Sequence, residues 1–245
     1  NNMNIFSITD GDLDEYFGFT DREVREMLRY YGLEENYETV KEWYDGYRFG
    51  KAEVYCPWDV VCYCSKHRKN KKLPPQNYWI NTSGNEVLRH FISGMASQRM
   101  VTKAQMERLV EGETVQKEIY QELTYPELYA SSDNLWSTLF MTGYLTQRGE
   151  PDGNLFHLAI PNREVRNIFT EQILKMFQEA AGRDGEALGA FCNALEYGRA
   201  GEVERRLTGY LEKTISSRDK FARKPTKENF YHGILLGILG FKDGW

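Results

Sequence analysis

The sequence lacks a long apolar run and a secretory signal, and both absences narrow the class of protein. No apolar stretch approaches the ~18 residues that a membrane-spanning helix needs. The first residues, NNMNIFSITD, contain neither a basic segment nor a long apolar core, as a secretory signal would. We therefore expect a cytoplasmic protein with no membrane partner. Because position 1 is not Met, we also expect the chain to begin inside a longer protein.

The paired C-x-x-C spacing of a structural zinc site is also lacking. The four cysteines include no C-x-x-C pair and the four histidines are scattered, whereas a structural zinc site needs ligand pairs at close spacing. We expect reduced, partly buried thiols and no metal site in this chain. The net charge of −5 argues against a surface that coats nucleic acid generally, but it is compatible with a local basic patch.

The stretch WYDGYRFGKAEVYCPW (43–58) contains two glycines and a lysine, which raises the question of a phosphate-binding loop. Such a loop has the pattern G-x-x-x-x-G-K-[ST] and opens a helix. Here only three residues separate Gly46 from the pair Gly50-Lys51, Ala52 follows, and the next segment reads as a strand. The stretch instead predicts a turn around both glycines, packed by aromatic side chains: Trp43, Tyr44, Tyr47, Phe49 and Trp58.

Helix signals are frequent in the first half of the chain. TDRE (20–23) is a capping box, which predicts a helix that runs to Tyr31 and stops at Gly32. EVYCPWDVVCYC predicts a short strand and then a helix with Pro57 at its first position. SGNE (83–86) and TKAQ (102–105) predict two further helix starts.

The second half predicts an apolar helix, a β-hairpin and then more helices. SSDNLWSTLFMTG predicts a helix that ends at Gly143, and the following segment alternates on both sides of a Gly/Pro/Asp turn. A helix followed by a two-stranded wing is the winged-helix plan. Pro161 is expected to open the next helix, and a helical hairpin (185–216) and a very apolar helix (228–240) follow. The fold class is therefore mainly α (α+β).

Several motifs together resemble one family. GFTDREV, EWYDGYRFG, VYCPWDV, YWINTSGNEV, LWSTLFMTGYLT, LAIPNREV and ENFYHGILLGIL occur in order along nearly the whole chain. They resemble AAA-ATPase-like bacterial proteins that carry a C-terminal PD-(D/E)XK nuclease-like domain. One departure is Cys56, which stands where the family usually has an Asn. That Asn would cap the helix at Pro57, and Cys caps poorly.

The resemblance implies that this chain is the central part of such a protein. Residues 1–181 would be a helical lid plus a winged-helix-like region, and residues 182–245 an incomplete helical start of the nuclease-like domain. The phosphate loop would precede the chain and the nuclease carboxylates would follow it, so ATP and Mg²⁺ are implied only for the parent protein. No Lys here has Asp or Glu two residues before it, so the [DE]-x-Lys half of a nuclease site cannot form. We expect the chain alone to be inactive and to hold no cofactor.

Two sets of residues remain as candidates for catalysis or cofactor binding. Glu228 and His232 lie one turn apart on the last expected helix. They either lie near the site of the expected nuclease sheet or form an ordinary pair on the helix surface. Polar residues beside aromatic ones could reach a nucleotide, although helix capping and an Asx-turn explain them equally well. The candidates of this second set are Asp45, Asn81, Thr82 and Asn85.

Nucleic acid is a candidate partner because of two basic segments. The first is the run HRKNKK (67–72), with Arg68, Lys69, Lys71 and Lys72, which could follow a phosphate backbone or be a solvated loop. The second is the helix at 102–110, with Lys103 and Arg108. The helix at 132–142 is too apolar to read bases.

Three functions are compatible with the sequence. The first is a connecting and regulatory region of an AAA-ATPase-like, nuclease-like protein, whose partner is the rest of the parent chain. The alternatives are a winged-helix DNA-binding module and a helical protein-interaction scaffold built on 185–216. The helix at 228–240 is apolar almost all round, so we expect it to pack on 185–216 and to promote self-association through its remaining face.

Overall fold

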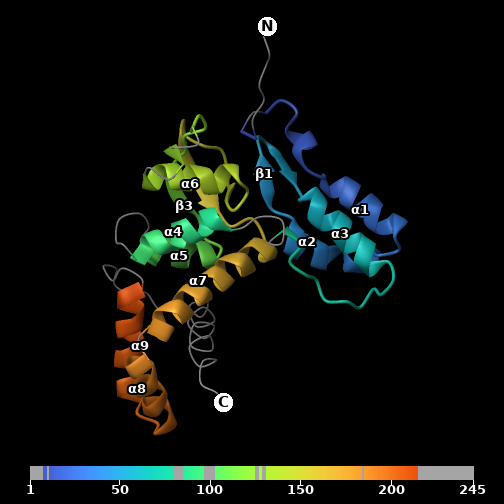
Figure 1. Ribbon diagram of the computed structural model, residues 1–245. Helices are drawn as coiled ribbons and strands as arrows, with labels where there is room; N and C mark the ends of the chain where they lie inside the picture. Colours follow the sequence, from blue (N-terminus) through green and yellow to red (C-terminus); the bar gives the residue numbers. More distant parts are fainter. Residues whose placement is uncertain are drawn as a thin grey trace.

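The computed structural model describes residues 8–9, 11–79, 85–96, 103–124, 127–128, 131–183 and 185–214. Within these ranges the chain is mainly helical with small antiparallel sheets, which confirms the predicted fold class. Figure 1 shows an N-terminal unit in blue and cyan, a second unit in green and yellow, and helix α7 leading from their junction to an orange helical pair.

The N-terminal unit (residues 11–79) consists of short helices around a two-stranded hairpin. Thr20 and Glu23 form the predicted capping box of α1, and Gly32 follows this helix with φ of 65°. Pro57 is the first residue of α3, and the Cys56 side chain makes no capping hydrogen bond, as expected. The elements are 3₁₀ helix η1 (Asp14–Phe17), α1 (Asp21–Tyr30), 3₁₀ helix η2 (Glu34–Asn36), α2 (Tyr37–Tyr44), β1 (Tyr47–Phe49), β2 (Ala52–Val54) and α3 (Pro57–His67).

The second unit (residues 85–159) combines three helices with a three-stranded antiparallel sheet in the order β3-β5-β4. The predicted hairpin is β4 and β5, in which Thr146 pairs with Ala159. Strand β3 was not predicted, and it adds to the other side of β5 through pairs such as Val115 with Leu158. The elements are α4 (Glu86–Ala96), α5 (Lys103–Val110), β3 (Val115–Glu118), α6 (Ser132–Met141), β4 (Thr146–Gln147) and β5 (Leu155–Ala159).

Helix α7 (Arg163–Arg183) follows the sheet directly and ends at the helical pair α8 (Gly185–Glu196) and α9 (Ala200–Thr214). The prediction that Pro161 opens this helix was wrong by two residues. Asn162 caps it instead, because its side-chain oxygen accepts from the backbone N–H of Val165 at 3.0 Å. The predicted helical hairpin is formed by α8 and α9, which pack against each other.

Two separate hydrophobic cores lie within the described part of the chain. The first is inside the N-terminal unit and is made by α1, α2 and α3. The second is formed by the sheet, by helices α4, α5, α6 and α8, and by the first half of α7. Trp136 is fully buried in it. Trp58, the second residue of α3, faces solvent with 54% of its surface exposed and belongs to neither core. The prediction that it packs the turn was therefore wrong. Among the described helices, none is both long and apolar enough to cross a bilayer.

Candidate functional site

The two units meet along a seam of hydrogen bonds and buried side chains. We define it as the contacts that the segment 46–50, Asp59 and Trp79 make with the segment 143–148, Pro161 and Glu164. The hydroxyl of Tyr47 donates to the carbonyl of Gly143 at 3.1 Å, and the backbone N–H of Arg48 donates to Thr146 Oγ1 at 2.8 Å. The side-chain amide of Gln147 donates to the carbonyl of Gly50 at 3.1 Å. Strand β4 thereby lies beside β1.

Arg148 ties three segments of the seam together. One guanidinium nitrogen donates to the carbonyl of Gly46 at 3.0 Å, and the other donates to the carbonyl of Pro161 at 3.2 Å. The planar guanidinium suits two such acceptors because its donors are fixed in a fork. Its donors therefore hold the turn after α2 against the segment that enters α7.

Gly46 allows this close approach. Its φ is 98°, and a Cβ at this position would lie 2.1 Å from the carbonyl oxygen of Pro161. Any side chain would displace one of two backbone segments, so the sequence around this turn requires glycine for a physical reason.

Two carboxyl groups lie in the buried part of the seam. Asp59, on α3, and Glu164, in the first turn of α7, are 2% and 0% exposed. Glu164 Oε1 accepts from the backbone N–H of Trp79 at 2.6 Å. Asp59 Oδ1 and Glu164 Oε2 have no hydrogen-bond partner, and the two carboxyl groups are close enough to influence each other's pKa. Burial raises the pKa of both groups, and for Glu164 the facing carboxylate of Asp59 adds to the effect.

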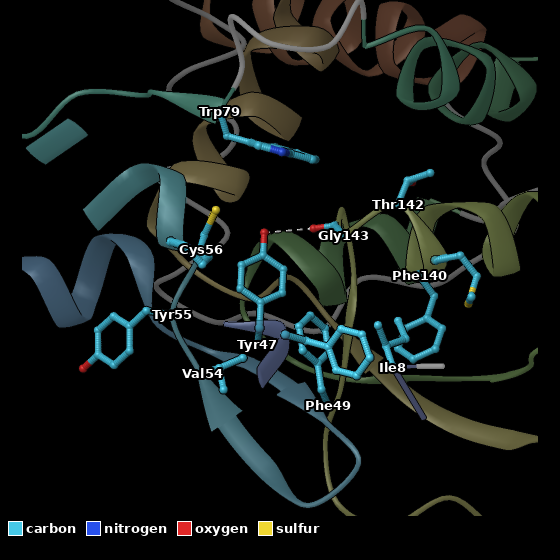
Figure 2. Close-up of a pocket in the computed structure, with 13 residues that line it drawn as sticks. Ile8, Tyr47, Phe49, Val54, Tyr55, Cys56, Trp79, Phe140, Thr142 and Gly143 are labelled. Atoms are coloured by element: carbon cyan, nitrogen blue, oxygen red, sulfur yellow. Dashed lines mark hydrogen bonds between the residues drawn. The ribbon is translucent and has the colours of Figure 1, made fainter. Parts of the chain in front are cut away.

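An apolar cavity of about 230 Å³ opens on the other side of the seam. Figure 2 shows the Tyr47 hydroxyl pointing to Gly143, with Trp79 and Cys56 on one side of the ring and Ile8, Phe49 and Phe140 on the other. The residues that line the cavity include no carboxylate, imidazole or ammonium group. Burial also raises the pKa of the Cys56 thiol to about 12, so this thiol is a poor nucleophile. The described lining is mainly apolar and offers no ordinary acid–base group.

Of the predicted cofactor residues, the structure describes Asp45 and Asn85, which belong to different units. Asn85 is buried with φ of 51°, and its side-chain oxygen accepts from the hydroxyl of Tyr144 at 2.7 Å, so it serves the second core. Asp45 ends α2, and burial raises the pKa of its half-buried carboxylate, which accepts from the backbone N–H of Gly46. Asn81 and Thr82 lie outside the described residues, as do Glu228 and His232.

The predicted basic residues are also distributed over separate places. Arg68, Lys69, Lys71 and Lys72 lie in the turn after α3, where the Lys71 ammonium donates to the carbonyl of Gly32. Arg108 is on α5 and forms an exposed ion pair with Glu113 at 3.2 Å. Lys103 is the first residue of α5. In Figure 1 α5 and the turn after α3 lie far apart, so the two segments do not form one basic surface.

Comparisons with known proteins returned no match: no family model, no curated protein and no solved structure corresponds to this chain. Within the ranges that the structure describes, no group of three or more His, Cys, Asp or Glu side chains is arranged to hold a metal ion.

The sequence analysis missed the residues that make the seam, namely Arg148, Asp59 and Glu164. Asp59 and Glu164 each follow a proline closely and lie in the first turn of a helix, where an acidic residue is common for its favourable interaction with the helix dipole. The segments PWD and PNRE do show a proline followed by an acidic residue. An exposed helix start gives the same pattern, so the pattern does not reveal that Asp59 and Glu164 are buried.

Proposed function

We propose that this chain is the central connecting region of an AAA-ATPase-like protein with a nuclease-like domain, and that it is not catalytic by itself. The resemblance of its motifs supplies the family, and the geometry of α7 supports the connecting role. In this proposal, ATP and Mg²⁺ belong to the parent protein, and the seam transmits a change in the N-terminal unit to the helices that follow.

One observation carries the connecting role: α7 contacts each part of the described chain. It packs against α2 of the N-terminal unit, against α4 and α5 of the second unit, and against α8 and α9 beyond them. Its first turn is held in the seam by Glu164, and the exposed ion pair of Arg163 with Glu42 lies beside it at 2.7 Å. With 21 residues it extends about 30 Å, so a rotation at the seam moves α8 and α9 as well.

The alternative of a DNA-reading module has less support. Residues 135–140 of α6 are all buried, so this helix cannot present them to a groove. The exposed tip of the β4–β5 hairpin carries Glu150 and Asp152, which would repel phosphates. Arg148, the basic residue next to this tip, already donates to two carbonyl groups.

Two assays of the purified 245-residue chain test this proposal. We expect no ATP hydrolysis above a buffer blank, and no retention of duplex DNA even at low salt. Hydrolysis by the chain alone would overturn the non-catalytic role, and salt-dependent DNA binding would favour the DNA-binding module. Self-association of this chain in light scattering, together with no response to nucleotide in the parent protein, would favour the interaction scaffold.

The reading frame around the chain gives an independent check of the family. The proposal requires a phosphate loop before residue 1 and an Asp…Glu-x-Lys set after residue 245. A complete reading frame without both would contradict it.

A further inference from the structure

The Asp59–Glu164 pair lies between two units that are also joined by hydrogen bonds between side chains and backbone groups. Asp59 belongs to α3 of the N-terminal unit and Glu164 to the first turn of α7. Both are almost completely buried, and none of the ion pairs among the described residues includes either of them. Two ionised carboxylates without a cation would be strongly unfavourable in such a site.

The groups that face the pair supply no positive charge. They are the thiols of Cys56 before α3 and Cys62 on α3, and the hydroxyls of Tyr44 on α2, Tyr47 on β1 and Tyr78 after α3. The raised pKa values of these groups, for which burial is the first cause, keep all of them neutral near pH 7.

The basic side chains nearest in sequence lie elsewhere. The guanidinium of Arg166, two residues after Glu164, lies beside Gly112 after α5. Arg163 precedes Glu164 directly, but its guanidinium pairs with Glu42 and lies over the ring of Trp43. Lys66, two turns after Asp59 on α3, donates to Gln76 at 2.8 Å and lies over the ring of Tyr78. The charge of the pair must therefore be reduced by a proton.

We propose that Asp59 and Glu164 share one proton, and that this proton pins α3 to the first turn of α7. Glu164 holds it on Oε2, because its Oε1 already accepts from the backbone N–H of Trp79. Asp59 accepts it, since the thiol of Cys56 also donates to this carboxyl group. The shared proton supplies a partner for both of the oxygens that otherwise have none.

Loss of the proton places two carboxylates against each other in a dry site and loosens the seam. The folded chain binds more protons than the unfolded chain, because folding raises the pKa of Asp59 to about 6 and that of Glu164 to about 8. The stability that the pair contributes is therefore complete in acid and decreases as the pH rises through these values. The seam becomes a contact that weakens in alkali, whatever the activity of the parent protein.

The first test compares the pH dependence of unfolding in three proteins. In the wild type, we expect the unfolding equilibrium constant to rise by about tenfold per pH unit between about pH 6 and pH 8, relative to Glu164→Gln. Glutamine keeps both hydrogen bonds, since its oxygen accepts from Trp79 and its NH₂ donates to Asp59, but it carries no titrating proton. The control is Glu150→Gln, an exposed carboxylate at the tip of the β4–β5 hairpin, which should retain the slope of the wild type. Equal slopes in wild type and Glu164→Gln would overturn the proposal.

The second test needs no variant that must fold. Infrared spectra of the wild-type chain labelled with ¹³C in the glutamate carboxyl groups should show one protonated carboxylic acid at pH 7, which disappears as the pH is raised to about 9. Fully ionised glutamates at pH 7 would overturn the proposal. Stabilisation by Mg²⁺ at constant ionic strength, together with no acid band, would show that a cation occupies the pair in place of the proton. Neither test uses ATP or the parent chain, so a failure here leaves the connecting role intact.

Discussion

The α-carbon of Gly46 lies against the carbonyl oxygen of Pro161, and Arg148 donates to the carbonyls of both residues. Three segments far apart in the sequence therefore meet at one point: the turn after α2, the end of β4 and the entry to α7. Neither hydrophobic core includes this point. Its stability depends on backbone geometry and hydrogen bonds, which makes it sensitive to single substitutions.

Gly46→Ala should be among the most destabilising single changes in this part of the chain. The added Cβ would lie 2.1 Å from the carbonyl oxygen of Pro161 at a φ of 98°, so we expect a loss of about 3 kcal/mol. Gly153→Ala is the matched control, because it has φ of 58° with open space around it and should cost about 1 kcal/mol. Urea unfolding of both variants measures the difference. Equal losses would show that the close approach does not exist in solution.

Arg148→Ala should destabilise the chain by about 3 kcal/mol, since it removes two charge-assisted hydrogen bonds to carbonyl groups that stay partly buried. Arg148→Lys should recover less than half of this loss, because an ammonium cannot reach two acceptors with fork geometry. Arg163→Ala removes a surface ion pair whose side chains are 49% and 59% exposed, and it should cost under about 1 kcal/mol. A cost for Arg148→Ala as small as that for Arg163→Ala would contradict the role of Arg148 in the seam.

The hydrogen bonds that Asp21 accepts predict that the folded chain loses stability in acid. Partial burial alone would raise its pKa, but hydrogen bonds from Tyr37, Arg25 and Tyr55 outweigh it and lower the pKa to about 2. A lowered pKa in the folded chain means that its contribution is present above pH 4 and is lost as the pH falls towards about 2. Because 47% of the side chain is exposed, we expect this contribution to be only about 1 kcal/mol.

Thermal unfolding between pH 5 and pH 2 measures the effect of Asp21. Asp21→Asn should be less stable than the wild type at pH 5, and the difference should shrink as the pH falls. Asp152→Asn, on the exposed hairpin tip, is the control and should follow the wild type throughout. A difference between Asp21→Asn and wild type that does not change with pH would refute this prediction.

Helices were the part of the fold most accessible from the sequence. Thr20, Glu23 and Pro57 are local signals that act within one helical turn, and the helices they begin are where they were predicted. Strand β3 was missed because VQKE has no alternation of its own and is a strand only through its pairing with β5. The outward position of Trp58 likewise depends on which face of α3 packs on α1 and α2, and residue type alone does not give this.

The seam was less predictable because its residues are far apart in the sequence and become neighbours only after folding. The requirement for glycine at 46 could be recognised from its turn, but its partner Pro161 could not. Asp59 and Glu164 each looked like an ordinary acidic residue in a first helical turn, and only the burial of both distinguishes them.

The proposed connecting role is tested most directly by hydrogen exchange in the parent protein that the proposal requires. Addition of ATP should change the protection of amides in α8 and α9, and Arg148→Ala should remove this response while nucleotide binding is retained. Arg108→Ala, which alters a surface ion pair away from the seam, should keep the response of the wild type. A response in α8 and α9 that survives Arg148→Ala unchanged, or no response in the wild type, would contradict the account.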